Sequence, residues 1–398
     1  MSGNLAIRNV HILGGPAVDL VIREGRIAAI GLGLAAPGIE TLDGKGRLLL
    51  PGLVESHTHL DKTLWGLPWR PNSAGPTLKD YIDNERRILR EVTVPIAKRA
   101  GGLLETCIAK GTLHFRSHID IDPEFGLTHV EAMLTLRERY RDIAEMQFVV
   151  FPQTGLLIRP GTAELMEQAL KLGVETVGGL DPAGIDGDPI RHLETVFGLA
   201  SKYGRGVDIH LHDREESGVW QIERIADFTA ASGLKGKVMI SHAYCLGQVP
   251  RARIEKLAQR LADLDISLMT SAPADTEIPP AGWLREVGVN LCCGSDGIRD
   301  AWSPFGNGDM LERAMLLAYR LDWSKDEMLA AALATVTDNG AKALGLHDYG
   351  IAVGHPANLL LIDAETIGDA VVRRPKERVV IARGKIVAKD GKFIDSRL

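Results

Sequence analysis

One local pattern, which occurs six times in the middle of the chain, restricts the fold more than any other feature. An amphipathic helical stretch ends and a short apolar run follows, as in ALKLGVETVGGLDP, ASKYGRGVDIHLHD and REVGVNLCCGSD. In five of the six copies a glycine separates the two parts, and glycine is the usual left-handed residue at the end of a helix. The apolar runs are rich in β-branched residues, Leu and Met, which is typical of buried parallel strands.

Two further runs, GLVESHTHL from residue 52 and QFVVFPQTG from residue 147, bring the expected strands to eight. Eight strands that alternate with helices over roughly 300 residues predict an α/β fold of the (β/α)₈, TIM-barrel type. A doubly wound open sheet is the alternative. It would have fewer strands and a glycine-rich phosphate loop, which we do not find in the sequence.

The two ends of the chain have a different pattern. Residues 4–50 and 357–394 show short alternating strands, with EG, RG and DG pairs that are typical of tight hairpin turns. Neither end has enough apolar surface to form a stable sheet alone. We therefore predict a discontinuous domain organisation, in which residues 1–50 and 351–398 form one small β-sandwich and residues 51–350 form the barrel.

Composition excludes several classes of protein. The 46 Lys and Arg against 52 Asp and Glu give a net charge of −6 without a basic patch, so no nucleic-acid partner is expected. No apolar run approaches the roughly 18 residues of a membrane helix, and the first residues do not resemble a secretory signal. The four cysteines form no CxxC pair, so we expect a reduced, cytoplasmic protein. Nothing in the sequence tests whether it forms a homo-oligomer.

Polar residues gather at the carboxyl ends of the expected strands, where a barrel of this type has its active site. Six of the 12 histidines fall there. The polar residues at the strand ends are, in chain order, His57, His59, His118, Asp120, Gln153, His210, His212, Asp213, His242 and Asp296.

The pair His57 and His59 is the most informative. Residues i and i+2 of a strand face the same side, so both imidazoles can point into one cavity and share a cation. His210 and His242 end two later strands and Asp296 ends the last. This spacing places nitrogen and carboxylate ligands around one barrel mouth, as a divalent metal requires.

The motifs PGLVESHTHLDK, DIHLHD, ISHA and GSD, at these intervals, resemble the amidohydrolase superfamily. FPQTG and GSDGIRDAWSPFGNGDML are most similar to its cytosine deaminase group, and the chain also resembles N-isopropylammelide amidohydrolases and pterin deaminases. The resemblance extends over essentially the whole chain.

The resemblance implies roles for individual residues. His242 would orient the attacking water, and Gln153 would bind the amide-like edge of a substrate ring. His118 and Trp302 are further candidates for substrate contact. One divalent ion, Zn²⁺ or Fe²⁺, would be bound by His57, His59, His210 and Asp296. Binuclear relatives need a carboxylated lysine at the end of strand four, and TVGGLDP has none.

Two positions depart from the family pattern. The family has a proton-transferring Glu where this chain has Asp213, which is one methylene shorter, and a misplacement of about 1 Å can reduce a rate about 100-fold. Either Asp213 still transfers the proton, or His212, Glu215 or Glu216 does, or the native reaction is slow or different. Gly297 replaces a second Asp, which favours a roomier pocket and a bulkier ring.

We therefore predict a metal-dependent hydrolytic deaminase of an aminated nitrogen heterocycle, such as a cytosine-like pyrimidine, a pterin or a triazine. Its catalytic residues would be Asp296, His242 and Asp213. The first alternative is hydrolysis of a cyclic amide or of an N-alkylamino C–N bond by the same site. The second is a non-catalytic binding barrel, against which the full set of metal ligands argues.

Overall fold

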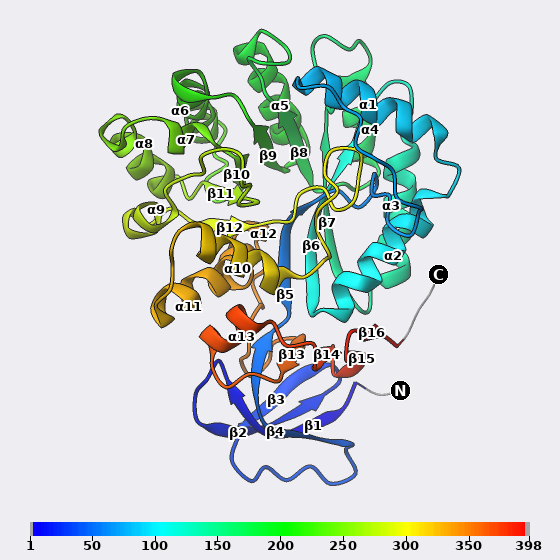
Figure 1. The fold of residues 1–398 in the computed structure, drawn as a ribbon, viewed down its shortest axis with the longest axis vertical. Helices are drawn as coiled ribbons and strands as arrows, with labels where there is room; N and C mark the ends of the chain where they lie inside the picture. The colour runs from blue at the N-terminus through cyan, green and yellow to red at the C-terminus, as the bar shows by residue number, and fades with distance from the viewer. Residues whose placement is uncertain (1–2, 395–398) are drawn as a thin grey trace.

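The computed structural model describes residues 3–394, which form a barrel with surrounding helices and, at one end of it, a second β-sheet (Figure 1). The barrel strands follow one another in chain order, and each pairs in parallel with the next. They are β5 (Leu53–Thr58), β6 (Thr112–Asp120), β7 (Glu145–Phe151), β8 (Thr176–Leu180), β9 (Gly206–Leu211), β10 (Val238–His242), β11 (Ser267–Thr270) and β12 (Leu291–Cys293).

The first and last strands of this sheet meet and close it. The backbone N–H of Asp296 donates to the carbonyl oxygen of His57 at 2.9 Å, and Thr58 pairs with Asp296 in a parallel bridge. The predicted (β/α)₈ barrel is confirmed.

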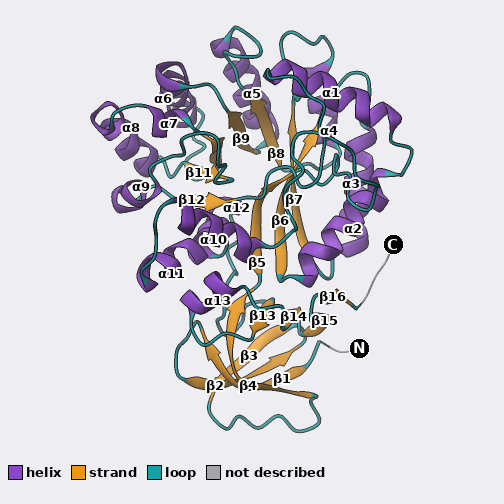
Figure 2. Ribbon diagram, in the orientation of Figure 1, coloured by secondary structure: helices purple, strands orange, loops and turns teal. Residues whose placement is uncertain are grey.

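Helices surround the barrel on its outside (Figure 2). Glycines end two of them as the sequence pattern predicts, since Gly204 and Gly288 are left-handed caps with φ of 64° and 97°. None of the helices between residues 3 and 394 has both the length and the apolar character needed to cross a bilayer. The helices are α1 (Leu78–Glu91), α2 (Ile96–Ala109), α3 (Thr128–Tyr140), α4 (Thr162–Lys171), α5 (Pro189–Tyr203), α6 (Glu215–Ala231), α7 (Cys245–Gln248), α8 (Arg251–Asp263), α9 (Ala281–Val287), α10 (Met310–Arg320), α11 (Asp326–Thr335), α12 (Asp338–Leu344) and α13 (Ile367–Arg373).

Both ends of the chain join in the second sheet, as predicted. β4 pairs with β1 on one side and with β13 on the other, so the N-terminal and C-terminal strands share one hydrogen-bonded sheet. The strand order is β16-β15-β14-β13-β4-β1-β2-β3. The strands are β1 (Leu5–Ile12), β2 (Ala17–Arg23), β3 (Arg26–Gly31), β4 (Thr41–Pro51), β13 (Leu359–Ile362), β14 (Arg378–Ala382), β15 (Lys385–Lys389) and β16 (Lys392–Phe393).

Three of the turn pairs form two-residue hairpins with both central residues at positive φ: Glu24–Gly25, Arg383–Gly384 and Asp390–Gly391. The DG pair at Asp43–Gly44 does not. This pair lies inside strand β4. Gly44 packs against Val10 of β1, and a Cβ on Gly44 would lie 2.2 Å from the Val10 side chain. The close contact between strands, and not a turn, explains this glycine.

The alternation of side chains in β13 fixes the second sheet to the barrel. Leu359 and Leu361 point into the core of the second sheet, whereas Leu360 and Ile362 belong to the core of the barrel. All four are fully buried. Successive side chains of a strand point to opposite faces, so β13 can contribute to two cores. This explains why all four of its residues are apolar.

Gly294 permits the closure of the barrel. A Cβ at this position would lie 2.6 Å from both the Cβ and the carbonyl oxygen of His57, and a backbone atom cannot move aside cheaply. The seam between β5 and β12 thus depends on a residue without a side chain.

We expect Gly294→Ala to lower the melting temperature by several degrees, because the added methyl group would separate the two strands. Gly198→Ala is the matched control: Gly198 lies inside α5 with open space around it, so this change should leave stability unchanged or raise it by about 1 kcal/mol. Circular dichroism melts of both variants test this. Equal melting temperatures would contradict the role of Gly294.

Candidate active site

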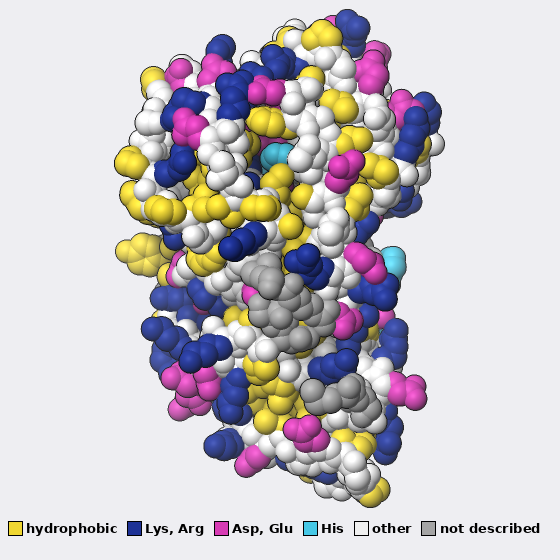
Figure 3. Space-filling view, turned by 90° about the vertical axis from the view of Figure 1, so that its right-hand side faces the viewer, with side chains coloured by type: hydrophobic (Ala, Val, Ile, Leu, Met, Phe, Trp, Pro, Cys, Tyr) yellow, Lys and Arg dark blue, Asp and Glu magenta, His cyan; other side chains and the backbone are white. Residues whose placement is uncertain are grey.

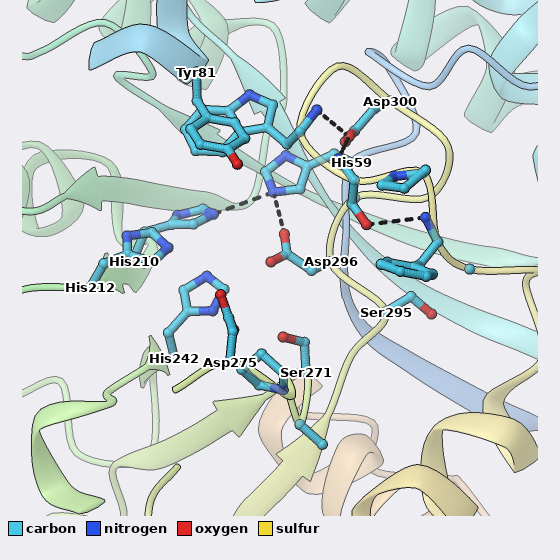
Figure 4. Close-up of a pocket in the computed structure, with 18 of the residues that line it drawn as sticks. His59, Tyr81, His210, His212, His242, Ser271, Asp275, Ser295, Asp296 and Asp300 are labelled. Atoms are coloured by element: carbon cyan, nitrogen blue, oxygen red, sulfur yellow. Dashed lines mark hydrogen bonds and ion pairs between the residues drawn. The ribbon is translucent and has the colours of Figure 1, made fainter. Parts of the chain in front are cut away.

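A cavity of about 870 Å³ opens at the carboxyl ends of the barrel strands. Residues of β9 and β10 and of the segments after β5 and β12 line it together (Figure 4). Six residues of the lining are polar residues that the sequence pattern placed at strand ends: His59, Gln153, His210, His212, His242 and Asp296. The barrel therefore brings together residues that lie far apart in the chain.

The four predicted metal ligands lie close together at this cavity: His59, His210 and Asp296 line it, and His57 is fully buried next to Asp296. His59 Nε2 lies 3.3 Å from Asp296 Oδ1 and 3.4 Å from His210 Nε2. His57 Nε2 lies 3.7 Å from the same oxygen of Asp296. His57, His210 and His242 also offer ring nitrogens that lie within 4.8 Å of one another.

These distances fit a divalent metal. Four donors about 2.0–2.1 Å from one ion at tetrahedral angles are about 3.3–3.4 Å apart, and the three pairs given above lie 3.3, 3.4 and 3.7 Å apart. His57 Nε2 is buried and has no hydrogen-bond partner among residues 3–394, although buried ring nitrogens are normally paired. The set of imidazoles and one carboxylate suits Zn²⁺ or Fe²⁺.

Burial keeps these groups in the protonation states that a metal needs. Burial lowers the pKa of His59 to about 4, and burial together with the neighbouring histidines holds the pKa of His210 well below its usual value. Burial alone would raise the pKa of Asp296, but the ring nitrogens of His57 and His59, which lie 3.7 and 3.3 Å from its Oδ1, hold it well below the usual range. Neutral imidazoles and an ionised carboxylate are the forms that bind metals.

Two of the site residues have unusual backbone conformations. His242, the last residue of β10, and Asp296, which comes three residues after the end of β12, have φ of 74° and 62°. Residues other than glycine adopt positive φ rarely and at an energetic cost, and such residues cluster at functional sites. The left-handed turn directs both side chains into the cavity (Figure 4).

A second layer of buried polar groups supports His57 from below. Ser241 Oγ donates to Asp208 Oδ1 at 2.8 Å and lies 2.9 Å from His57 Nδ1. Since its only hydrogen goes to Asp208, Ser241 accepts the hydrogen of Nδ1, which leaves the Nε2 lone pair of His57 free for a metal. The Arg116 guanidinium lies 3.4 Å from the other oxygen of Asp208. The sequence analysis missed this layer, and its only signal was polar residues in otherwise apolar strands.

Glu55 is a second group that the sequence analysis missed. Its carboxylate is buried at the barrel seam, where Oε1 accepts the backbone N–H of Ser295 at 2.8 Å. Burial raises the pKa of Glu55 to about 7. The carboxylate therefore ties β5 to the segment that carries Asp296.

Of the three residues predicted to contact the substrate, two line the cavity and one does not. Gln153 and Trp302 line the cavity, and Trp302 stacks on Tyr81 at a centroid distance of 5.3 Å. His118 does not line the cavity in the described part of the chain. It is fully buried inside the barrel, with its ring centre 3.9 Å from that of His57 and Nε2 3.6 Å from Asp208 Oδ2.

The neighbouring residues His212 and Asp213 differ in whether their side chains line the cavity. His212 lines the cavity, stacks on His242 at 4.3 Å, and lies 2.8 Å from Asp181 through Nδ1. Burial would lower the pKa of His212, but the Asp181 carboxylate raises it above the usual value. Among residues 3–394, Asp213 is not part of the lining. Its carboxylate accepts the N–H of Gly184 at 3.0 Å and the amide of Gln221 at 2.9 Å.

The interpretation of Gly297 as a sign of a roomier pocket is wrong at this position. A Cβ on Gly297 would lie 2.1 Å from Asp300 Oδ2 and 2.8 Å from its carboxyl carbon. The Asp300 carboxylate therefore fills the space that a side chain at position 297 would occupy. The local pocket is not enlarged, because a carboxylate from three residues further along the chain takes this place.

We expect Ser241→Ala to weaken metal binding by about 10- to 100-fold, because His57 loses the acceptor that fixes its tautomer. The dissociation constant for Zn²⁺, measured by chelator competition on the metal-free protein, is the readout. Ser201→Ala, an exposed serine on α5, is the matched control and should leave it unchanged. An unaltered constant in Ser241→Ala would show that the second layer does not support the ligand.

Comparison with known proteins agrees with this geometry. The family model described as Amidohydrolase family matches residues 102–394. The structure of N-isopropylammelide isopropylaminohydrolase from Burkholderia multivorans is 43% identical, covers 99% of this chain and 100% of its own, and superposes with a TM-score of 0.96. N-isopropylammelide isopropyl amidohydrolase of Pseudomonas sp. (strain ADP) is 32% identical in an alignment 399 positions long, which covers 97% of this chain and 98% of that protein.

The structure of 5-methylcytosine deaminase from Klebsiella pneumoniae, with 5-fluorocytosine bound, is 29% identical and covers 98% of both chains with a TM-score of 0.85. These similarities confirm the resemblance to the cytosine deaminase group and extend over the barrel and the second sheet alike. The chain therefore belongs to the amidohydrolase family, a family of metal-dependent enzymes, and is a hydrolase that acts on non-peptide C–N bonds.

Proposed function

We propose that this enzyme hydrolyses the bond between a ring carbon of a nitrogen heterocycle and its exocyclic amine. The observation that carries the proposal is the meeting of His57, His59, His210 and Asp296 at a cavity whose wall includes His242. We propose one metal ion, Zn²⁺ or Fe²⁺, at these four residues. β8 ends in Gly178, Gly179 and Leu180, so it offers no lysine for a second ion.

The bound metal would supply the Lewis acidity that makes water nucleophilic near neutral pH. Asp296 is ionised and would itself be one of the four ligands, so its carboxylate is in place to accept a proton from the attacking water. His242 lines the cavity next to this position and orients the water. Proton transfer to the ring nitrogen and then to the amine breaks the C–N bond, which leaves a lactam and a free amine.

The placement of side chains favours His212 for this proton transfer. Of the open alternatives, His212 lines the cavity and has a carboxylate partner, Asp181, which is the arrangement that keeps an imidazole ready to exchange a proton. Asp213 stays the second candidate. It would have to give up its bonds to Gly184 and Gln221 in order to reach the cavity.

A flat ring suits the aromatic part of the cavity wall. Tyr81 and Trp302 lie there as a stacked pair, and aromatic faces bind planar rings well. Gln153 lines the same cavity and would hydrogen-bond the edge of the ring. His118, which lies behind His57, would act on the ligand and not on the substrate.

An N-alkylamino group is the second candidate for the leaving amine. The apolar residues Leu180, Phe305 and Leu316 line the cavity together with Pro273 and Pro304, and they could enclose an alkyl substituent. Two relatives, at 43% and 32% identity, are named for the removal of an isopropyl amine from N-isopropylammelide. Both observations favour an alkylamine over ammonia.

The size and lining of the cavity support a small molecule as the partner, and the surface charge argues against a nucleic acid. On the face shown in Figure 3, basic and acidic side chains are interspersed, so this face offers no broad basic surface to a nucleic acid.

We propose a cytoplasmic location because all four cysteines are free and buried, as in a protein kept reduced.

A panel of aminated rings tests the proposed reaction. Metal-loaded protein should release ammonia or an alkylamine from at least one of cytosine, pterin, 2-aminotriazines and N-isopropylammelide. Asp296→Ala should lose both the metal and turnover, whereas His242→Ala should keep the metal and lose turnover by at least 100-fold. Metal analysis and amine detection provide the readouts. A metal-loaded protein that releases no amine from any ring would contradict the proposal.

His212→Ala should reduce kcat by about 100- to 10,000-fold, the usual contribution of general acid–base catalysis, with the metal retained. Asp213→Asn should reduce kcat by less than about tenfold, because its carboxylate holds the backbone of Gly184 outside the cavity. Steady-state kinetics on the best substrate of the panel compares them. The reverse order would return the proton transfer to Asp213.

A further inference from the structure

Asp300 has one carboxylate oxygen that the chain uses and one that it does not. Oδ1 accepts the backbone N–H groups of Trp302 and Ser303, both at 2.8 Å. Oδ2 is buried, and it has no hydrogen-bond partner among residues 3–394. The residue is 9% exposed, and it lines the same cavity as His59 and Asp296 (Figure 4).

The carboxylate is held rigidly in this place. The backbone N–H of Asp300 donates to the carbonyl oxygen of Ser303 at 3.1 Å, which closes a tight turn around Oδ1. Oδ2 lies 2.1 Å from the position of a Cβ on Gly297, so only glycine at 297 leaves room for it. The turn holds the carboxylate, and the space left by Gly297 allows the unpaired oxygen to lie against the segment that follows the metal ligand Asp296.

An unpaired buried carboxylate oxygen is costly, and the neighbouring cation does not satisfy it. Lys62 is the nearby positive charge, but its ammonium forms ion pairs with Glu85 at 3.0 Å and with Asp120 at 3.5 Å. Burial raises the pKa of Asp300 to about 6, even though Lys62 opposes this shift. Natural proteins normally pair such atoms, so an acceptor left free at a cavity wall indicates a donor that comes from outside the chain.

We propose that Asp300 is a substrate-binding residue whose Oδ2 accepts a hydrogen bond from a ring N–H of the heterocycle. This inference rests on the proposed function and narrows its substrate class to rings in the lactam form, which carry an N–H group beside a carbonyl. Trp302, whose backbone N–H holds the carboxylate, lines the same cavity and stacks on Tyr81, so one turn would recognise both the face and the edge of the substrate.

The test measures binding without turnover. In the metal-loaded His242→Ala background, calorimetry compares N-isopropylammelide, which has ring N–H groups as a lactam, with its ring-N-methylated counterpart, which has none. Adding Asp300→Asn replaces the accepting oxygen with an N–H₂ donor of equal size. We expect it to weaken binding of the N–H ring by about 10- to 100-fold and that of the methylated ring by less than about twofold.

The control for the loss of charge is Asp322→Asn, an exposed residue in the left-handed conformation that Asn also adopts, and it should change neither constant. Metal content and melting temperature show whether Asp300→Asn is intact. Should that variant fail to fold, the protein with Asp300 must still bind the N–H ring at least about tenfold more tightly than the methylated ring.

Equal weakening of both rings by Asp300→Asn, or no saturable binding of either ring, would overturn the proposal. The proposed reaction fails separately, because it depends on amine release by the protein with His242 in place. Tight, Asp300-dependent binding without any turnover would support Asp300 as a substrate-binding residue and contradict the proposed hydrolysis.

Discussion

The hydrogen bond from the backbone N–H of Asp296 to the carbonyl oxygen of His57 is the contact on which the rest of the structure depends. It closes the barrel between its first and last strands, and in the same step it brings the carboxylate of Asp296 to the imidazoles of His57 and His59. Gly294 and Glu55 serve the same seam, the first by leaving space and the second by accepting the N–H of Ser295. Closing the fold and assembling the site are therefore one event.

The electrostatics of the site follow from this closure. The ring nitrogens of His59 and His210 are buried in an interior that disfavours the imidazolium form, so they face the cavity as neutral donors. Two sets of buried charges beside the ligands are paired: Asp208 with Arg116, and Lys62 with Glu85 and Asp120. Buried ion pairs contribute little to stability, so their place beneath and beside the ligands indicates that they orient the site.

Much of this could be predicted because barrel geometry is periodic. Residues at the carboxyl ends of parallel strands must meet at one mouth, so the positions of His57, His59, His210, His242 and Asp296 already specified a site. Contacts between layers have no such signature. Ser241 and Asp208 looked like ordinary polar residues in strands, and the chain distance between them gave no indication that they bond to each other.

The sequence alone determined the barrel, the joining of both chain ends in one second sheet, and the set of candidate metal ligands, because each follows from local patterns repeated along the chain. Only the tertiary structure decided which side chains reach the cavity. His212 enters and Asp213 turns away to Gly184, although they are neighbours, and Asp300 fills the space beside Gly297. The physical reason is that left-handed turns and backbone hydrogen bonds after each strand set the direction of a side chain, and these depend on contacts with other loops.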